Sequence, residues 1–205
     1  MSFRIIFKVI IMLNCVIFIT PAKSQPSVVI TSRTFHPKHE GDSLNTIQII
    51  EELGAERIDW MYENEKRGRL EDITAKVGGV PLKKEINFMT NHANLYPSLA
   101  ESEVWEKIKE RENQINSREH SYIPKTEIQK AEPMLHDGDI VAFTSSVEGL
   151  DVNHMGVITK VGSRAYLIHA SLAGKKVIIS NVPLAEYVAS VPKHTGMIVA
   201  RLTDH

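Results

Sequence analysis

The stretch from Leu135 to Val182 constrains the fold most, because it contains several short apolar and β-branched runs separated by turn residues. The runs lie within residues 136–143, 150–158 and 165–171, and Gly, Asp, Asn or Ser bounds each of them. Such spacing is typical of short strands in quick succession. Further strands are expected at residues 177–180 and 197–202, with a short helix between them that begins at Pro183.

Helices are expected upstream of these strands. Apolar residues recur with helical spacing from Leu44 to Leu53, after a cap at Asp42 or Ser43. The pattern Ser98-Leu99-Ala100-Glu101 is a capping box, which predicts a helix to about Ser117. Residues 28–34 are expected to form a short strand or an extended arm. Successive antiparallel strands behind helices predict an α+β domain.

Two of the expected strands carry one histidine each, His154 and His169. If Gly162 and Ser163 form a two-residue turn, His154 lies opposite Ser171, and His169 is its diagonal neighbour on the same face, about 7 Å away between backbones. A three-residue turn would place the rings on opposite faces. We take the two-residue turn, because Gly-Ser is an acceptable tight-turn pair. Two histidines on one face indicate a base and its orienting partner, whereas a random pair is more often structural.

The first 24 residues have the features of a secretory signal. Arg4 and Lys8 form a short basic region, residues 9–20 are nearly all apolar, and Ala22-Lys23-Ser24 supplies the small residues that cleavage requires. The apolar run is short for a membrane span. We therefore expect a secreted or periplasmic protein, cleaved after Ser24, without stable membrane insertion after cleavage. An uncleaved anchor is the alternative.

Cys15 is the only cysteine of the chain, and it lies inside the expected signal. The cleaved chain would therefore have no disulfide, no thiolate metal site and no thiol nucleophile. The net charge is −1, and acidic and basic residues are interspersed along the chain, so no extended basic surface for nucleic acid is expected. About 180 residues remain after cleavage, which is enough for one domain with its own core.

Three motifs carry a resemblance to a known family: Gly138-Asp139-Ile140-Val141, Asp151-x-x-His154-x-Gly156-Val157-Ile158 and His169-Ala170-Ser171. They resemble the NlpC-type, papain-like hydrolases of bacterial cell walls, and more narrowly their N-acetylmuramoyl-L-alanine amidase-like branch. Residues 59–64, 68–74, 84–92 and 95–99 are similar to the same branch, in its order, so the resemblance covers about residues 59–201. It implies a papain-like fold, with a small antiparallel sheet or half-barrel packed against helices. The implied partner is peptidoglycan or a muropeptide, and no cofactor is expected.

The resemblance also assigns roles. In this branch the histidine at the position of His154 is the general base, and that at the position of His169 orients it. The nucleophile is a cysteine that follows Asp at the start of an upstream helix, and no residue here matches it. Asp42-Ser43 is a faint counterpart, so Ser43 is the candidate substitute. A helix N-terminus can lower the pKa of a thiol into the working range, but not that of an alcohol, so capping is the favoured role of Ser43.

Four residues are candidate substrate contacts: His92, Asp139, Asp151 and Ser171. His92 either borders the cleft or binds backbone in its loop. Asp139 either contacts substrate or satisfies backbone donors in its turn, as such residues more often do. Asp151 could join His154 and His169 in a histidine-based metal site, although no metal ligand is assigned.

The sequence therefore predicts three parts: a signal peptide at 1–24, a short divergent N-terminal segment at 25–58, and an amidase-like domain at 59–205. The expected function is a secreted protein that acts on or binds bacterial peptidoglycan, with hydrolysis impaired because the cysteine is missing. Two alternatives stay open. One is an active amidase or peptidase with Ser43 as nucleophile, and the other is a histidine-based metal site.

Overall fold

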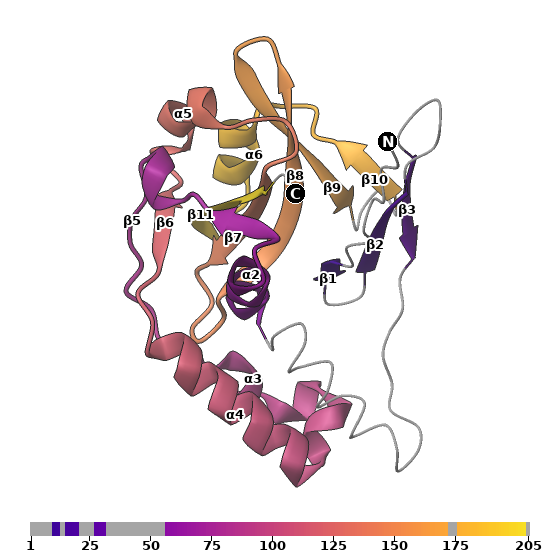
Figure 1. The fold of residues 1–205 in the computed structure, drawn as a ribbon, viewed down its shortest axis with the longest axis vertical. Helices are drawn as coiled ribbons and strands as arrows, with labels where there is room; N and C mark the ends of the chain where they lie inside the picture. The colour runs from indigo at the N-terminus through magenta and orange to yellow at the C-terminus, as the bar shows by residue number, and fades with distance from the viewer. Residues whose placement is uncertain (1–9, 13–14, 21–26, 32–55, 172–175, 204–205) are drawn as a thin grey trace.

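The computed structural model describes residues 10–12, 15–20, 27–31, 56–171 and 176–203 (Figure 1). Ser43 and the helix expected after it lie outside the described residues. Within the described ranges, no helix combines the length and apolarity needed to cross a membrane.

An eight-stranded antiparallel sheet is the centre of the fold, and it confirms the predicted α+β class. Its strands in chain order are β4 (Leu70–Asp72), β5 (Val80–Pro81), β6 (Ser121–Pro124), β7 (Ile140–Ser145), β8 (Val152–Val161), β9 (Arg164–Ser171), β10 (Lys176–Ile179) and β11 (His194–Leu202). Their order in space is β10-β9-β8-β7-β11-β6-β5, and β4 also pairs with β11. The last strand therefore lies in the middle of the sheet, between β7 and the early strands β4 and β6.

Five α-helices belong to the described part of the chain: α2 (Arg57–Lys66), α3 (Phe88–Asn91), α4 (Ser102–Asn116), α5 (Ile128–Ala131) and α6 (Leu184–Ser190). Helix α4 ends where the sequence predicts, but the predicted capping box is wrong. Residues Pro97–Ala100 form a 3-10 turn, and Glu101 caps α4 without a side-chain hydrogen bond. The turn forms because Pro97 favours its first position and because Leu99 packs into a small core with Val104 and Ile108.

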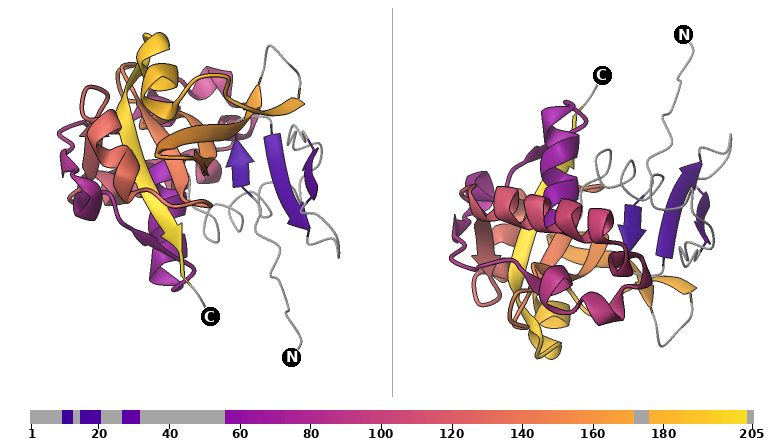
Figure 2. Two further views of the ribbon diagram at one scale, coloured as in Figure 1. Left: turned by 90° about the horizontal axis from the view of Figure 1, so that it is seen from above. Right: turned by 90° about the horizontal axis from the view of Figure 1, so that it is seen from below.

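The sheet has two apolar faces, because successive side chains of a strand point to opposite sides. Helices α2 and α4 cover one face, where Ile58 and Ile115 pack against Ala142 and Ile198. Helices α5 and α6 cover the other face (Figure 2). The core on that side includes Ile128, Phe143, Leu167, Leu184 and Val199.

The hairpin of β8 and β9 has the two-residue turn that the sequence predicts. Val161 pairs with Arg164 across Gly162 and Ser163, and Gly162 has a φ of 61°, which glycine adopts without steric cost. Two bulges interrupt neighbouring ladders. One shifts the register between β7 and β8 after Phe143, and the other shifts β11 against β7 between His194 and Gly196. A bulge re-aims the side chains beyond it.

A separate three-stranded antiparallel sheet comprises β1 (Ile10–Met12), β2 (Cys15–Thr20) and β3 (Ser27–Thr31). Strand β3 agrees with the strand expected at residues 28–34. Strands β1 and β2 fall within the segment expected to be a signal peptide.

Candidate functional site

The rings of His154 and His169 lie on the same face of the sheet and contact each other. Nε2 of His154 is 2.9 Å from Nδ1 of His169, which is a hydrogen bond. The ring planes are nearly perpendicular, at 89°, with centroids 5.0 Å apart. His154 pairs with Phe143 of β7, so the face is the one that α6 covers. The two-residue turn predicted from the sequence therefore places the two imidazoles within hydrogen-bond distance of each other.

A third imidazole, His194 at the start of β11, borders this pair. Its ring lies almost parallel to that of His154, at 7°, with centroids 6.4 Å apart. It stacks on Phe143 at 4.8 Å, and Tyr187 of α6 lies 5.0 Å from His169 and 6.1 Å from His194. His194 is buried, and its Nδ1 has no hydrogen-bond partner among the described residues.

Burial governs the protonation of these rings. It lowers the pKa of His154 to about 4, helped by His169, His194 and the positive charge of Arg57. It lowers the pKa of His194 to about 4, helped by Lys125, and it also lowers the pKa of His169. All three imidazoles are consequently neutral at pH 7, since a low-dielectric environment disfavours the charged form.

A neutral His154 can act as a proton acceptor. The contact of its Nε2 with Nδ1 of His169 fixes the ring orientation. In the tautomer in which Nε2 carries the proton and donates to His169, Nδ1 is the nitrogen left to accept a proton. Nδ1 of His154 has no hydrogen-bond partner in the described part of the chain. No cysteine occurs between residues 56 and 203, so the described site holds a base and its orienting partner without a thiol.

His92 and Asp139 are engaged in local contacts. The exposed His92 ring stacks on Phe88 at 4.1 Å, and its Nδ1 bonds the Phe88 carbonyl at 2.9 Å. The buried carboxylate of Asp139 accepts from the backbone N–H of His136 and twice from Arg201, at 2.7 and 2.8 Å. These contacts agree with the backbone-binding role of His92 and the turn-forming role of Asp139.

Asp151 joins the start of α2 to the start of β8. Its buried carboxylate accepts from the backbone N–H of Ile58 at 2.9 Å and from that of Val152. Arg57 donates to the Val152 carbonyl at 2.8 Å. The adjacent Glu56 is buried, and burial together with the charge of Asp151 raises its pKa well above the usual range. Asp151 therefore has a structural role here, in anchoring α2.

The structure gives fewer contacts for the last two candidates, Ser171 and the histidine-based metal site. Ser171 is the last residue of β9, half-buried and paired with Lys176 of β10. Among residues with described side chains, no three histidine, cysteine or acidic groups are placed to hold a metal ion. The proposed metal site of His154, His169 and Asp151 thus has no support from this geometry.

Sequence reasoning missed His194 and Tyr187. The predicted last strand begins at Met197, three residues after His194, and simple alternation would point His194 away from Met197. The bulge at residues 194–196 reverses that parity and brings His194 to the face of Phe143. The bulge depends on pairing with β7, more than forty residues away, so no local signal reveals it.

Residues 57–197 match the family described as N-acetylmuramoyl-L-alanine amidase-like. Three crystal structures of an N-acetylmuramoyl-L-alanine amidase from Bacteroides uniformis are 34% identical to the chain, with TM-scores of 0.68 to 0.69. The match covers 73% of this chain and 64% of theirs, so the chain spans less than two thirds of their length. A comparison with curated proteins finds no match.

Two further structures are similar. A protein from Bacteroides fragilis, described as a candidate xylanase, is 29% identical over 80% of this chain and 77% of its own, with a TM-score of 0.69. The protein LPG0564 from Legionella pneumophila is 20% identical over 72% of this chain and 60% of its own, with a TM-score of 0.50. The similarity to LPG0564 concerns the fold alone.

Proposed function

Because the chain belongs to the N-acetylmuramoyl-L-alanine amidase-like family, we propose that it binds peptidoglycan fragments beside His154 and His169 and that its hydrolytic activity is impaired. The observation that carries the proposal is the 2.9 Å contact between two neutral imidazoles, those of the half-buried His154 and the buried His169, in a stretch of chain without a cysteine. The pair has the geometry of a general base and its orienting residue.

In amide hydrolysis by a thiol, the base takes the thiol proton and returns it to the leaving amine. In this proposal Nδ1 of His154 makes both transfers, and the contact with His169 at 2.9 Å supports its role in holding the ring. The attacking sulfur is the missing part, since Cys15 is the only cysteine and lies in the expected signal. Removal of the nucleophile from such a group leaves a small residual rate, which positioning and binding supply.

Two finer assignments belong to this proposal. The fold is a papain-like one of the NlpC type, which the hairpin-borne histidine pair and the antiparallel sheet support. The protein is secreted or periplasmic, which the basic start, the apolar residues 9–20 and the small residues before the expected cleavage site support.

The competing function is an active amidase or peptidase in which Ser43 replaces the cysteine. A neutral His154 with an uncommitted Nδ1 is the feature that favours it, because such a base can activate a nearby hydroxyl. The two functions make opposite predictions for the release of product.

A soluble N-acetylmuramoyl-peptide tests both functions. Calorimetry should detect binding to the purified protein, and binding should weaken by about tenfold or more in His154→Ala, while the exposed-turn variant His136→Ala binds as the wild type does. Release of free peptide amine should not exceed the level of His154→Ala. Release that depends on both His154 and Ser43 would instead establish the active enzyme. Absence of binding would contradict the proposed function.

A further inference from the structure

A pocket of about 200 Å³ opens on the sheet face opposite to the histidines. Its floor is apolar and consists of Ile58 and Met61 of α2 and Ile198 of β11. Ile198 belongs to the core under α2 and α4, whereas its neighbours Met197 and Val199 belong to the core of Phe143. The pocket and the histidine pair are therefore separated by the sheet.

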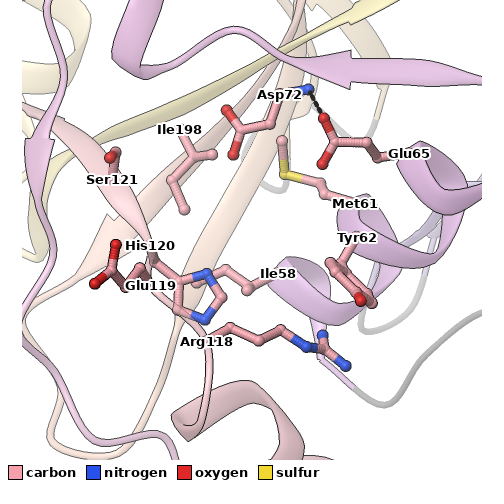
Figure 3. A pocket seen from close by; sticks show the side chains of 10 residues that line it. All are labelled: Ile58, Met61, Tyr62, Glu65, Asp72, Arg118, Glu119, His120, Ser121 and Ile198. Atoms are coloured by element: carbon pink, nitrogen blue, oxygen red, sulfur yellow. Dashed lines mark hydrogen bonds between the residues drawn. The ribbon is translucent and has the colours of Figure 1, made fainter.

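The two ends of the pocket carry opposite charges (Figure 3). Glu65 and Asp72 lie at one end, where Glu65 accepts from the backbone N–H of Asp72 at 2.8 Å. Arg118 lies at the other end and supplies the positive charge there, and the apolar floor lies between the two ends. Glu119 and His120 also line the pocket. Such an arrangement is complementary to a ligand with an ammonium at one end and a carboxylate at the other.

Arg118 is held in place before any ligand arrives. Its Nη1 donates to the fully buried carboxylate of Asp59 at 3.0 Å, and its guanidinium carbon lies 3.6 Å from the centre of the Tyr62 ring. A guanidinium has five N–H donors in a fixed plane, so the bond to Asp59 leaves an edge for a second carboxylate. A fixed donor costs less ordering entropy on binding than a mobile one.

We propose that this pocket is a second ligand site, which takes a small zwitterionic peptide of dipeptide size. The volume corresponds to about seven waters at ~30 Å³ each, which is below the usual range for drug-sized ligands. An aliphatic dipeptide body matches the floor, its ammonium faces Glu65 and Asp72, and its carboxylate faces Arg118. The proposal does not rest on the function proposed for the histidine pair, because the sheet separates the two sites.

The test is an NMR titration of the full-length protein with L-alanyl-L-alanine, with methionine methyl groups observed. The Met61 methyl should shift with a Kd in the millimolar range, about −4 kcal/mol for so small a ligand, while the methyl of Met197 on the other face should not. The amide-capped and the N-acetylated dipeptide should each bind about threefold to fivefold more weakly, since each loses one surface ion pair.

The double variant Glu65→Gln/Asp72→Asn removes both charges and keeps both hydrogen-bond acceptors. It should lose affinity for the zwitterion and bind the N-acetylated dipeptide as the wild type does. The exposed α4 variant Glu103→Gln is the matched control and should change nothing. Equal binding of all three peptides, no loss in the double variant, or no shift of Met61 would each overturn the proposal. His154→Ala should leave the titration unchanged, so failure here and failure at the histidine pair are distinguishable.

Discussion

His154 and His194 are kept neutral by what surrounds them, since burial is the largest cause of the low pKa of each. A neutral imidazole is the form that accepts a proton. The contact with His169 then decides which nitrogen of His154 is available. Protonation of the site is therefore a property of the packed core around Phe143 and not of the histidines alone.

Titration of the histidine ring signals by NMR should show midpoints near pH 4 for His154 and His194. Because the folded pKa lies below the ordinary value of 6.5, the unfolded state binds more protons between pH 4 and 6.5, so these rings lower stability as the pH falls through that window. Replacement His194→Phe should raise the midpoint of His154, because His194 takes up a proton in the same pH range and its positive charge then disfavours that of His154. A midpoint above pH 6 for His154 would contradict the burial argument.

The variant Asp139→Ala distinguishes the two roles considered for this residue, which are contact with substrate and stabilisation of its turn. The change leaves Arg201 and the N–H of His136 without their buried acceptor, so the free energy of unfolding should fall by about 2–4 kcal/mol. Urea denaturation measures the loss, and Asp137→Ala in the same turn should show a smaller one. Unchanged stability with lost binding of the N-acetylmuramoyl-peptide would establish Asp139 as a substrate contact instead.

The first turn of helix α2 depends on buried charges. Asp59 binds Arg118 beyond the end of α4, and Asp151 accepts the N–H of Ile58, 93 residues away along the chain. Glu56 opposes this arrangement, because its buried carboxylate lies near that of Asp151 and its Oε1 has no hydrogen-bond partner. The attachment of α2 to the sheet therefore weakens when Glu56 ionises.

Glu56→Gln should stabilise the protein at pH 8 by about 1–3 kcal/mol, since it removes a buried carboxyl whose ionised form is repelled by Asp151. The pKa of Glu56 is raised in the folded state, so the wild type loses stability as the pH rises above 4.5 towards that pKa. The advantage of the variant should accordingly grow from pH 5 to pH 8 and vanish near pH 4. Thermal unfolding across this range is the measurement. A stability difference between variant and wild type that does not change with pH, or no difference at pH 8, would contradict this prediction. The variant Glu103→Gln, at an exposed position, is the control.

In the molecule as a whole, the sheet cannot be completed until the last strand is present. Strand β11 pairs with β7, with β6 and with β4, so it joins the later hairpins to the early strands. Pairing between segments so distant in sequence carries a high loop-closure cost.

Deletion of residues 191–205 should therefore abolish cooperative folding, although it removes only the C-terminal end. The deletion exposes the inner edges of β7 and β6 and removes Met197, Ile198 and Val199 from both cores. Circular dichroism during heating should show no sharp transition, in contrast to the full chain. A sharp transition in the truncated protein would show that the sheet folds as two independent parts.

Local sequence patterns predicted much of the fold. The α+β class, the strands after Leu135 and the helix ending near Ser117 follow from periodicity and turn residues, and the structure agrees with them. The failed capping box at Ser98 shows the limit of local reasoning. Burial of Leu99 against Val104 and Ile108 prevailed over the preference of four residues for a capped helix start.

The sequence alone determined the pairing of His154 with His169, because a two-residue turn sets the register of its own hairpin and the side-chain period of a strand is two. Only the tertiary structure decided that His194 joins them, that Glu56 meets Asp151, and that opposite charges border the pocket under α2. These contacts join segments far apart in the chain, and they depend on bulges and on packing between layers. A local sequence pattern carries no information about bulges or about packing between layers, because the same residues could face one side of the sheet or the other until distant strands pair.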